Sequence, residues 1–219
     1  MCQSMQLYFA VLRIGLYTFF RRICGKAPAA PKPTFSVLCL GLANSGKSTI
    51  LTLLSGENAD GIRPTVGFSI KALMFADCFV DVKELGGSDN VRMYWNKYFC
   101  GAQAVIFVID SAGSKESMQT ANAELHKALA DPELDGLPLL VLGNHQDKEG
   151  ARSKEQITKE LELGLQSTAR KWIIHTCSMK NKEEIMAAFQ DFNKLLLEMK
   201  EKEEREDKTE EQDGEFSKI

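Results

Sequence analysis

A short glycine-rich segment constrains this chain more than any other feature of its sequence. Residues 41–48 read Gly-Leu-Ala-Asn-Ser-Gly-Lys-Ser and fit the pattern G-x-x-x-x-G-K-[ST]. An apolar strand pattern precedes the segment and a helical pattern follows it, so that backbone N–H groups and a helix N-terminus converge on phosphate oxygens. The pattern predicts a phosphate site in which Lys47 bridges the β- and γ-phosphates and Ser48 ligates Mg²⁺. A glycine-rich turn without a ligand is the alternative, and the flanking strand and helix disfavour it.

Apolar residues alternate between strand and helix periodicity along the middle of the chain. Strands are predicted at 35–40, 67–75, 79–85, 104–110, 137–143 and 171–176, the second and third as a hairpin. Helices are predicted at 47–55, 115–130 and 153–163. A long terminal helix follows, with an apolar face made by Ile185, Phe189, Phe192, Leu196 and Met199. This alternation predicts an α/β fold, with a mostly parallel six-stranded sheet between helices on both faces.

The segment after the fifth predicted strand is a candidate base-binding loop. It reads Asn144-His145-Gln146-Asp147, and N-x-x-D alone is common by chance. At the carboxyl end of a late parallel strand, however, it lies on the ligand-binding edge of the sheet. A carboxylate there accepts two hydrogen bonds from guanine in a pattern that adenine does not offer. We therefore expect guanine rather than adenine; a solvated turn is the alternative.

Two further segments are candidates for sensing the terminal phosphate. The Thr65 hydroxyl, between the first helix and the hairpin, would complete Mg²⁺ coordination when a γ-phosphate is present. After the second hairpin strand, Glu84 would hold a Mg²⁺-bound water and Gly86 would offer its N–H to the γ-phosphate. Ordinary turns are the alternative for both segments.

Charge and cysteine usage limit the class of protein. The chain has 219 residues, with 27 basic and 30 acidic side chains and a net charge of −3. This balance argues against a general nucleic-acid binder, so no nucleic-acid partner is expected. The six cysteines form no C-x-x-C pair, so neither a zinc site nor a disulfide scaffold is predicted.

The two ends differ from the middle, which predicts three parts: 1–33, 34–199 and 200–219. Residues 5–20 form an apolar run that is short for a membrane span, and we expect an amphipathic helix in a membrane interface. Cys2 and Cys24 flank this run and are candidates for S-palmitoylation, while a helix packed on its own domain is the alternative. A proline-rich spacer follows. Residues 200–219 are predicted to be a frayed helix end and an acidic, disordered tail.

Taken in order, these residues resemble the Arf-like group of small GTPases. The resemblance rests on GLANSGKST, PTVGF, ELGGSDNVRMYWNKYF, VIFVIDSA and NHQD, and it covers roughly residues 5–200. It implies a P-loop small-GTPase fold that binds GTP or GDP with Mg²⁺. The first switch would be 58–68 and the second 86–99.

The resemblance also assigns roles to individual residues. The nucleotide-binding residues would be Gly41, Ala43, Asn44, Ser45, Gly46, Lys47, Ser48, Thr49, Gly87, Asn144, His145, Asp147, Cys177 and Ser178. Ser48 and Thr65 would ligate Mg²⁺ directly, and Glu84 through a water. Phe68, Trp95 and Tyr98 match positions that hold effectors, with core packing as the alternative.

Departures from the family pattern weaken the expectation of catalysis. Ser88 stands where the family usually has the Gln that orients the attacking water, so no catalytic residue is assigned and hydrolysis is expected to be slow. Glu84 replaces an Asp, His145 replaces the Lys of N-K-x-D, and Lys83 replaces an interswitch Trp. Ala43 stands where the phosphate loop often has Gly or Asp.

These observations favour a membrane-attached, GTP-dependent switch or adaptor. We expect it at the cytoplasmic face of Golgi, endosomal or plasma membranes, with a cytosolic pool, and acting on effectors through its switches. The resemblance implies one further partner, the CBS-pair domains of cyclin-M-type magnesium transport mediators. A nucleotide-insensitive pseudo-GTPase scaffold is the main alternative. A P-loop kinase is disfavoured because residues 110–200 contain no arginine cluster for a lid.

Overall fold

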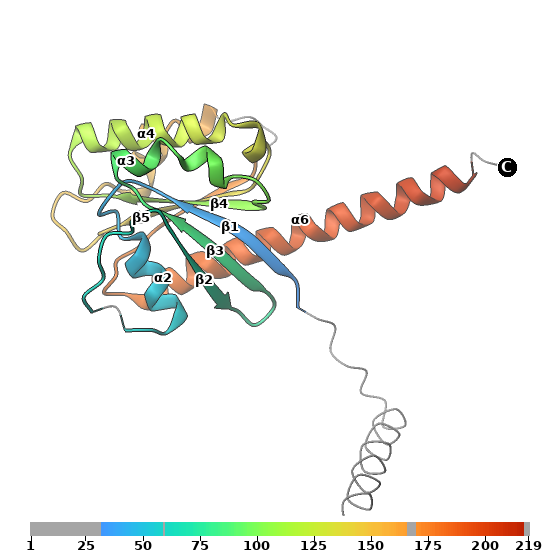
Figure 1. The fold of residues 1–219 in the computed structure, drawn as a ribbon, viewed down its shortest axis with the longest axis horizontal. Coiled ribbons are helices and arrows are strands. Elements are labelled where there is room, and N and C mark those ends of the chain that lie inside the picture. Colours follow the sequence, from blue (N-terminus) through green and yellow to red (C-terminus); the bar gives the residue numbers. More distant parts are fainter. Residues whose placement is uncertain (1–31, 59, 166–169, 217–219) are drawn as a thin grey trace, which may run out of the picture. The chain divides into compact units, whose positions relative to one another are not determined.

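A six-stranded sheet forms the centre of the molecule (Figure 1). The computed structural model describes residues 32–58, 60–165 and 170–216, with side chains in the last helix described through residue 206. The strands are β1 Thr34–Leu40, β2 Phe68–Met74, β3 Phe79–Leu85, β4 Ala104–Asp110, β5 Leu139–Asn144 and β6 Trp172–Thr176. Their order is β2-β3-β1-β4-β5-β6, and only β2, paired with β3, runs antiparallel to its neighbour. The mostly parallel sheet and the hairpin are thus confirmed.

Helices cover both faces of this sheet, as predicted (Figure 1). The α-helices are α2 Lys47–Ser55, α3 Asp89–Arg92, α4 Lys115–Leu129, α5 Lys154–Glu160 and α6 Lys182–Phe216. A short 3₁₀ turn follows each of α3, α4 and α5 and precedes the next strand. These turns are η1 Trp95–Tyr98, η2 Pro132–Leu134 and η3 Leu163–Leu165. One core lies under α2 and α6, and the other under η1, α4 and α5.

The side-chain alternation of a central strand shows why two cores form. In β1, Val37 and Cys39 point into the core under α2 and α6, whereas Leu38 and Leu40 point into the opposite core. Strands that are buried on both faces read as continuous apolar runs, which is what the sequence shows at β4 and β5. Because β1, β3, β4 and β5 are parallel, their carboxyl ends meet at one edge of the sheet. The candidate site residues follow these ends.

Two helix boundaries differ from the prediction. α5 ends at Glu160 rather than 163, and Glu162 has a left-handed φ of 51° before η3 begins. α6 continues through Phe216, where a frayed end and a disordered tail were predicted. Its charges match at helical spacing, since Glu201 pairs with Arg205 and Lys202 with Glu206, each four residues apart. The spacing of these charges, rather than their number, is thus the feature of the sequence that favours the helix.

The predictions for the N-terminal segment lie outside the described residues. They concern the interfacial helix at 5–20, the spacer, and the acylation candidates Cys2 and Cys24. Within residues 32–58, 60–165 and 170–216, no helix combines the length and the apolar character that crossing a membrane requires.

Candidate nucleotide-binding site

The glycine-rich loop between β1 and α2 has a backbone that only glycine permits at two positions. Gly41 and Gly46 have φ of 143° and 94°. A Cβ at Gly41 would lie 2.2 Å from the Val108 carbonyl oxygen, and one at Gly46 would lie 2.1 Å from the Asn144 amide nitrogen. No side chain caps the N-terminus of α2. The loop therefore leads into a helix end whose N–H groups are available to an anion.

The Lys47 side chain lies across this loop. Its ammonium donates hydrogen bonds to the carbonyls of Gly41 and Leu42, both at 2.9 Å, and the side chain is buried. Burial lowers the pKa of Lys47, and the nearby Glu84 carboxylate opposes this shift. The positive charge is thus held at the floor of the loop, where phosphate oxygens are expected.

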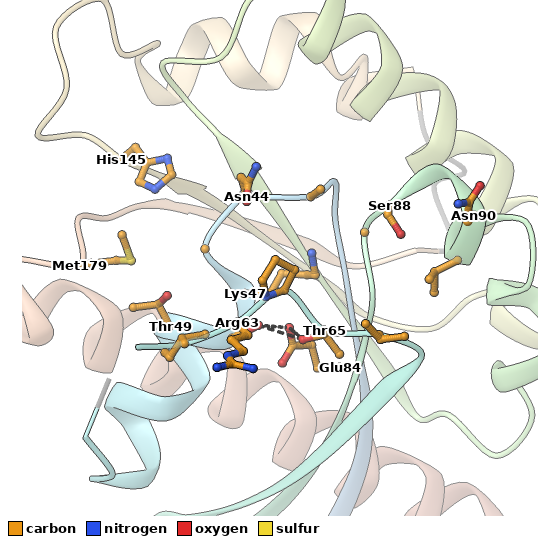
Figure 2. A pocket seen from close by; sticks show the side chains of 18 residues that line it. Asn44, Lys47, Thr49, Arg63, Thr65, Glu84, Ser88, Asn90, His145 and Met179 are labelled. Atoms are coloured by element: carbon orange, nitrogen blue, oxygen red, sulfur yellow. Dashed lines mark hydrogen bonds between the residues drawn. The ribbon is translucent and has the colours of Figure 1, made fainter. Parts of the chain in front are cut away.

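Ser48, Thr65 and Glu84 meet although they come from three different segments. Glu84 Oε1 accepts hydrogen bonds from Ser48 Oγ at 2.5 Å and from Thr65 Oγ1 at 3.1 Å, and the two hydroxyls are themselves 3.1 Å apart. Figure 2 marks these bonds with dashed lines beside the labelled Thr65 and Glu84. The carboxylate is 2% exposed. The three residues predicted to be near Mg²⁺ are therefore brought together.

The chemistry of these three residues fits Mg²⁺. The cation prefers oxygen ligands and is usually held by one or two carboxylates or hydroxyls together with substrate phosphates. Within the described residues there is no cluster of three or more acidic, histidine or cysteine side chains that would hold a metal without such phosphates. The Glu84 carboxylate accepts hydrogen bonds from both hydroxyls directly.

Asn144 makes a contact that the sequence did not predict. Its side chain is fully buried, and Nδ2 donates to the Ser45 carbonyl at 2.9 Å. It therefore fastens the glycine-rich loop to the end of β5. Cys177, predicted to line the base, is instead buried in the core, and burial raises the pKa of its thiol to about 12.

Asp147 is oriented by residues of the loop after β6. Its carboxylate accepts a hydrogen bond from Ser178 Oγ at 2.8 Å and pairs with Lys180 Nζ at 3.0 Å. Together, the Lys180 and Ser178 hydrogen bonds lower the pKa of Asp147 to about 2. The carboxylate is consequently ionised at neutral pH, as an acceptor for guanine requires. Ser178 acts on this carboxylate, a contact that the sequence analysis did not foresee.

His145 joins a polar network that the sequence analysis missed. The residue has φ of 66° and is 6% exposed. Its Nδ1 lies 2.9 Å from Asp110 Oδ1 and 3.1 Å from Lys148 Nζ. Partial burial would raise the pKa of Asp110, but the His145 hydrogen bond and the charge of Lys148 lower it below its ordinary value. The position of Asp110 at the end of β4, next to β5, is the signal that would have identified it.

The second-switch glycines pack tightly against both neighbouring loops. Gly86 donates its N–H to the Gly67 carbonyl at 2.8 Å, so this group is not directed at a phosphate as predicted. The Gly87 carbonyl accepts the Ala43 N–H at 3.0 Å, and a Cβ at Gly87 would lie 2.3 Å from the Leu42 carbonyl carbon. Gly86 thus ties the second switch to the first, and Gly87 ties it to the phosphate loop.

These segments enclose a cavity of about 490 Å³, a volume typical of small-ligand sites. Predicted residues that line it are Ala43, Asn44, Gly46, Lys47, Ser48, Thr49, Thr65, Glu84, Gly87, Ser88 and His145. The other predicted residues are not among those that line it; they are Gly41, Ser45, Asn144, Asp147, Cys177 and Ser178. Lining residues that had not been assigned as nucleotide-binding are Ile62, Arg63, Pro64, Val66, Asn90 and Val91. Met179, which was expected to line the base from the loop after β6, is also part of the lining. Figure 2 shows the cavity with its main side chains labelled.

The three effector candidates separate into two groups. Phe68 is 49% exposed, and its ring centroid lies 5.3 Å from that of the half-buried Tyr98. Trp95 is 3% exposed, and its indole N–H donates to the Gly86 carbonyl at 2.9 Å. An effector-facing role for Trp95 was therefore wrong, because the side chain packs in the core and holds the second switch.

Comparison with known proteins identifies the family. Residues 20–196 match the profile of the ADP-ribosylation factor family, so the chain belongs to this family, whose members bind guanine nucleotides. Within it, the chain is 44% identical to the Bos taurus ADP-ribosylation factor-like protein 15 over 180 residues, covering 82% of this chain and 89% of the relative. The Homo sapiens protein of the same name is 43% identical over 182 residues, covering 83% and 89%.

A solved structure supports the fold. The Arl6 small GTPase from Trypanosoma brucei, solved with the nucleotide analogue GppNp, superimposes with a TM-score of 0.68 at 24% identity. It covers 75% of this chain and 98% of its own. The family assignment also removes the P-loop kinase alternative.

Proposed function

We propose that this chain is a nucleotide-dependent switch or adaptor that hydrolyses GTP weakly. The observation that carries this proposal is the meeting of Ser48, Thr65 and Glu84. The phosphate loop, the first switch and the end of β3 each contribute one of these residues. A change at the phosphates therefore acts on the first switch through Thr65. It also reaches the second switch, because Glu84 lies only three residues before Gly87.

Mg²⁺ would be held by the Ser48 and Thr65 hydroxyls, with Glu84 next to them. When bound, it would neutralise charge between the β- and γ-phosphates. The chain's own residues divide the remaining work. Lys47 supplies a fixed positive charge, the α2 N-terminus supplies N–H donors, and Asp147 is the ionised acceptor for guanine. Together, these groups supply contacts for the phosphates and for the guanine base.

The second switch has no glutamine at the position that usually orients water for hydrolysis. Ser88 lines the cavity and precedes α3, at the position where the family usually has Gln. A serine hydroxyl is shorter than a glutamine amide and offers no N–H₂ donor from the same backbone position. Weak turnover follows, so the output of the protein is binding to partners rather than product formation.

An exposed apolar row on β2 is the surface we propose for effectors. Phe68, Ile70 and Met74 are 49%, 60% and 80% exposed and share one face of this edge strand. Lys83, in place of the usual Trp, lies directly opposite Ile70 on β3. A partner should therefore present apolar side chains together with an acidic one. We include among such partners the CBS-pair domains of cyclin-M-type magnesium transport mediators.

Membrane attachment is the part of the proposal that rests on the sequence of residues 1–33. An amphipathic helix at 5–20 and acylation of Cys2 or Cys24 would supply the two signals that stable anchoring needs. We place the protein at the cytoplasmic face of Golgi, endosomal or plasma membranes, with a cytosolic pool. Releasing thioesters with hydroxylamine should move it out of the membrane fraction; retention would argue against acylation.

A nucleotide-insensitive scaffold is the second candidate, and one observation favours it. Glu84, Ser88 and His145, which all line the cavity, depart from the family pattern. These departures favour a scaffold whose partner binding does not depend on the nucleotide.

One experiment separates these candidates. The full chain is loaded with GDP or with GppNp, and each form is tested for capture of a purified CBS-pair domain. A switch captures more partner with GppNp, whereas equal capture in both states identifies a scaffold. Nucleotide extracted from the purified protein is identified in the same sample, and absence of any guanine nucleotide binding contradicts both the switch and the weak GTPase.

A further inference from the structure

Arg63 is a cavity-lining residue to which no role has been assigned. It lies in the first switch, two residues before Thr65, and its side chain is among those that line the cavity (Figure 2). The side chain is exposed. Among the arginines that the structure describes, it is the one without a hydrogen bond or ion pair. The others, which all have partners, are Arg92, Arg152, Arg170 and Arg205.

Arg63 belongs to the same stretch of the cavity lining as Thr65. Thr65 is fixed there by its 3.1 Å contacts to Ser48 and Glu84. Pro64 has a restricted φ and also favours an extended backbone at Arg63. These two restrictions limit the positions that the Arg63 guanidinium can reach. The base-side lining residues His145 and Met179 come from other loops, at the ends of β5 and β6.

The other charged side chains in and near the cavity are already balanced by groups of opposite charge. Lys47 and Glu84 are both buried, and their opposite charges offset each other. Arg92, which lies nearby in α3, is already paired with Asp89 at 2.7 Å and with Glu124 at 3.2 Å. Arg63 therefore supplies the excess positive charge of the cavity lining. A planar guanidinium binds phosphate oxygens through two parallel hydrogen bonds, which a lysine cannot do.

We propose that Arg63 is a ligand of the terminal phosphate of bound GTP. It adds a charged contact to the first switch beside the Thr65 hydroxyl, and GDP lacks the atoms that this contact needs. The inference rests on the proposed function, since it assumes that GTP occupies this cavity. Its consequence is a preference for GTP over GDP that comes from a side chain rather than from the phosphate loop.

The test compares the dissociation constants of fluorescent GDP and GppNp for the wild type, Arg63→Ala and Arg63→Lys. Arg63→Ala should weaken GppNp binding about tenfold or more, the scale of one charge-assisted hydrogen bond, and leave GDP binding within about twofold. Arg63→Lys should lose less GppNp affinity than Arg63→Ala, because lysine keeps the positive charge but lacks the two parallel N–H donors of the guanidinium. Lys159→Ala, an exposed residue of α5, removes one positive charge elsewhere and should change neither constant.

Equal weakening of GDP and GppNp by Arg63→Ala would overturn the inference, as would unchanged GppNp binding. In both cases the wild type still binds nucleotide, so the proposed function survives. A wild type that binds neither nucleotide would overturn the inference and the proposed function together. The melting temperatures of the variants without nucleotide should match the wild type, because Arg63 is exposed.

Discussion

The side-chain amide of Asn144 donates to the Ser45 carbonyl at 2.9 Å, across 99 positions of the sequence. This bond joins the end of β5 to the middle of the phosphate loop. The shape of the loop thus depends on a residue that lies far away in the sequence.

Replacing Asn144 by Ala should destabilise the protein even without nucleotide. The buried Ser45 carbonyl would lose its partner, at a cost of about 1–3 kcal/mol in the free energy of unfolding. Urea denaturation measures this change, with Asn96→Ala, an exposed asparagine, as the matched control. If Asn144→Ala is as stable as the wild type, the hydrogen bond from Asn144 to Ser45 contributes nothing to folding.

Ser88→Gln should raise the rate of GTP hydrolysis in single-turnover experiments. The longer amide can orient a water that serine does not reach, and we expect at least about a tenfold gain. Ser88→Asn carries the same amide on a side chain one methylene shorter and should recover less. If neither variant is faster than the wild type, the defect lies elsewhere, with Ala43 or Glu84 as the next positions to change.

Removing Mg²⁺ with EDTA should speed GDP release by about tenfold or more, since the cation would link the phosphates to the chain. The Ser48 hydroxyl then returns to Glu84, its partner at 2.5 Å. Stopped-flow dissociation of labelled GDP gives the rate. Identical rates with and without EDTA would mean that these residues do not hold a metal.

The Asp147 carboxyl should titrate far below its ordinary value of 3.8, at about 2. Since the folded-state pKa is depressed, the stabilisation is present above the unfolded value and is lost as pH falls from about 3.8 toward 2. Lys180→Ala and Ser178→Ala should each raise the pKa of Asp147, which carboxyl NMR detects. A carboxyl that titrates near 3.8 in the wild type would contradict the arrangement.

Phe68 and Trp95 should respond in opposite ways to substitution. Phe68→Ala should reduce capture of an effector with little loss of stability, because the ring is about half exposed. Trp95→Phe loses the hydrogen bond to Gly86, at a cost of about 0.5–1.5 kcal/mol in unfolding free energy. Thermal melts and pull-down assays on both variants decide this. Lower capture by a fully stable Trp95→Phe would restore Trp95 as an effector contact.

The sequence predicted those features that depend on neighbouring residues. The strands, the hairpin and the phosphate loop follow from local periodicity and from glycines at Gly41 and Gly46. The hydrogen bond of Asn144 could not be predicted in this way, because its partner Ser45 is distant in the sequence. The sequence alone does not distinguish an amide that is buried from one that binds a base. The direct bonds of Glu84 to Ser48 and Thr65 appear only when the three segments are packed together.

The register in which β2 pairs with β3 connects the first switch to the second through the hairpin. Phe68, the last residue of the first switch, pairs with Leu85, which directly precedes Gly86 of the second. A slip of one residue would turn Phe68 and Ile70 to the opposite face of the sheet, whereas a slip of two would keep them outside. Sliding of β2 along β3 is therefore restricted to even steps. The pairing of Phe68 with Leu85 therefore joins the end of the first switch to the residue that precedes the second, so a change of register at one switch would alter the other.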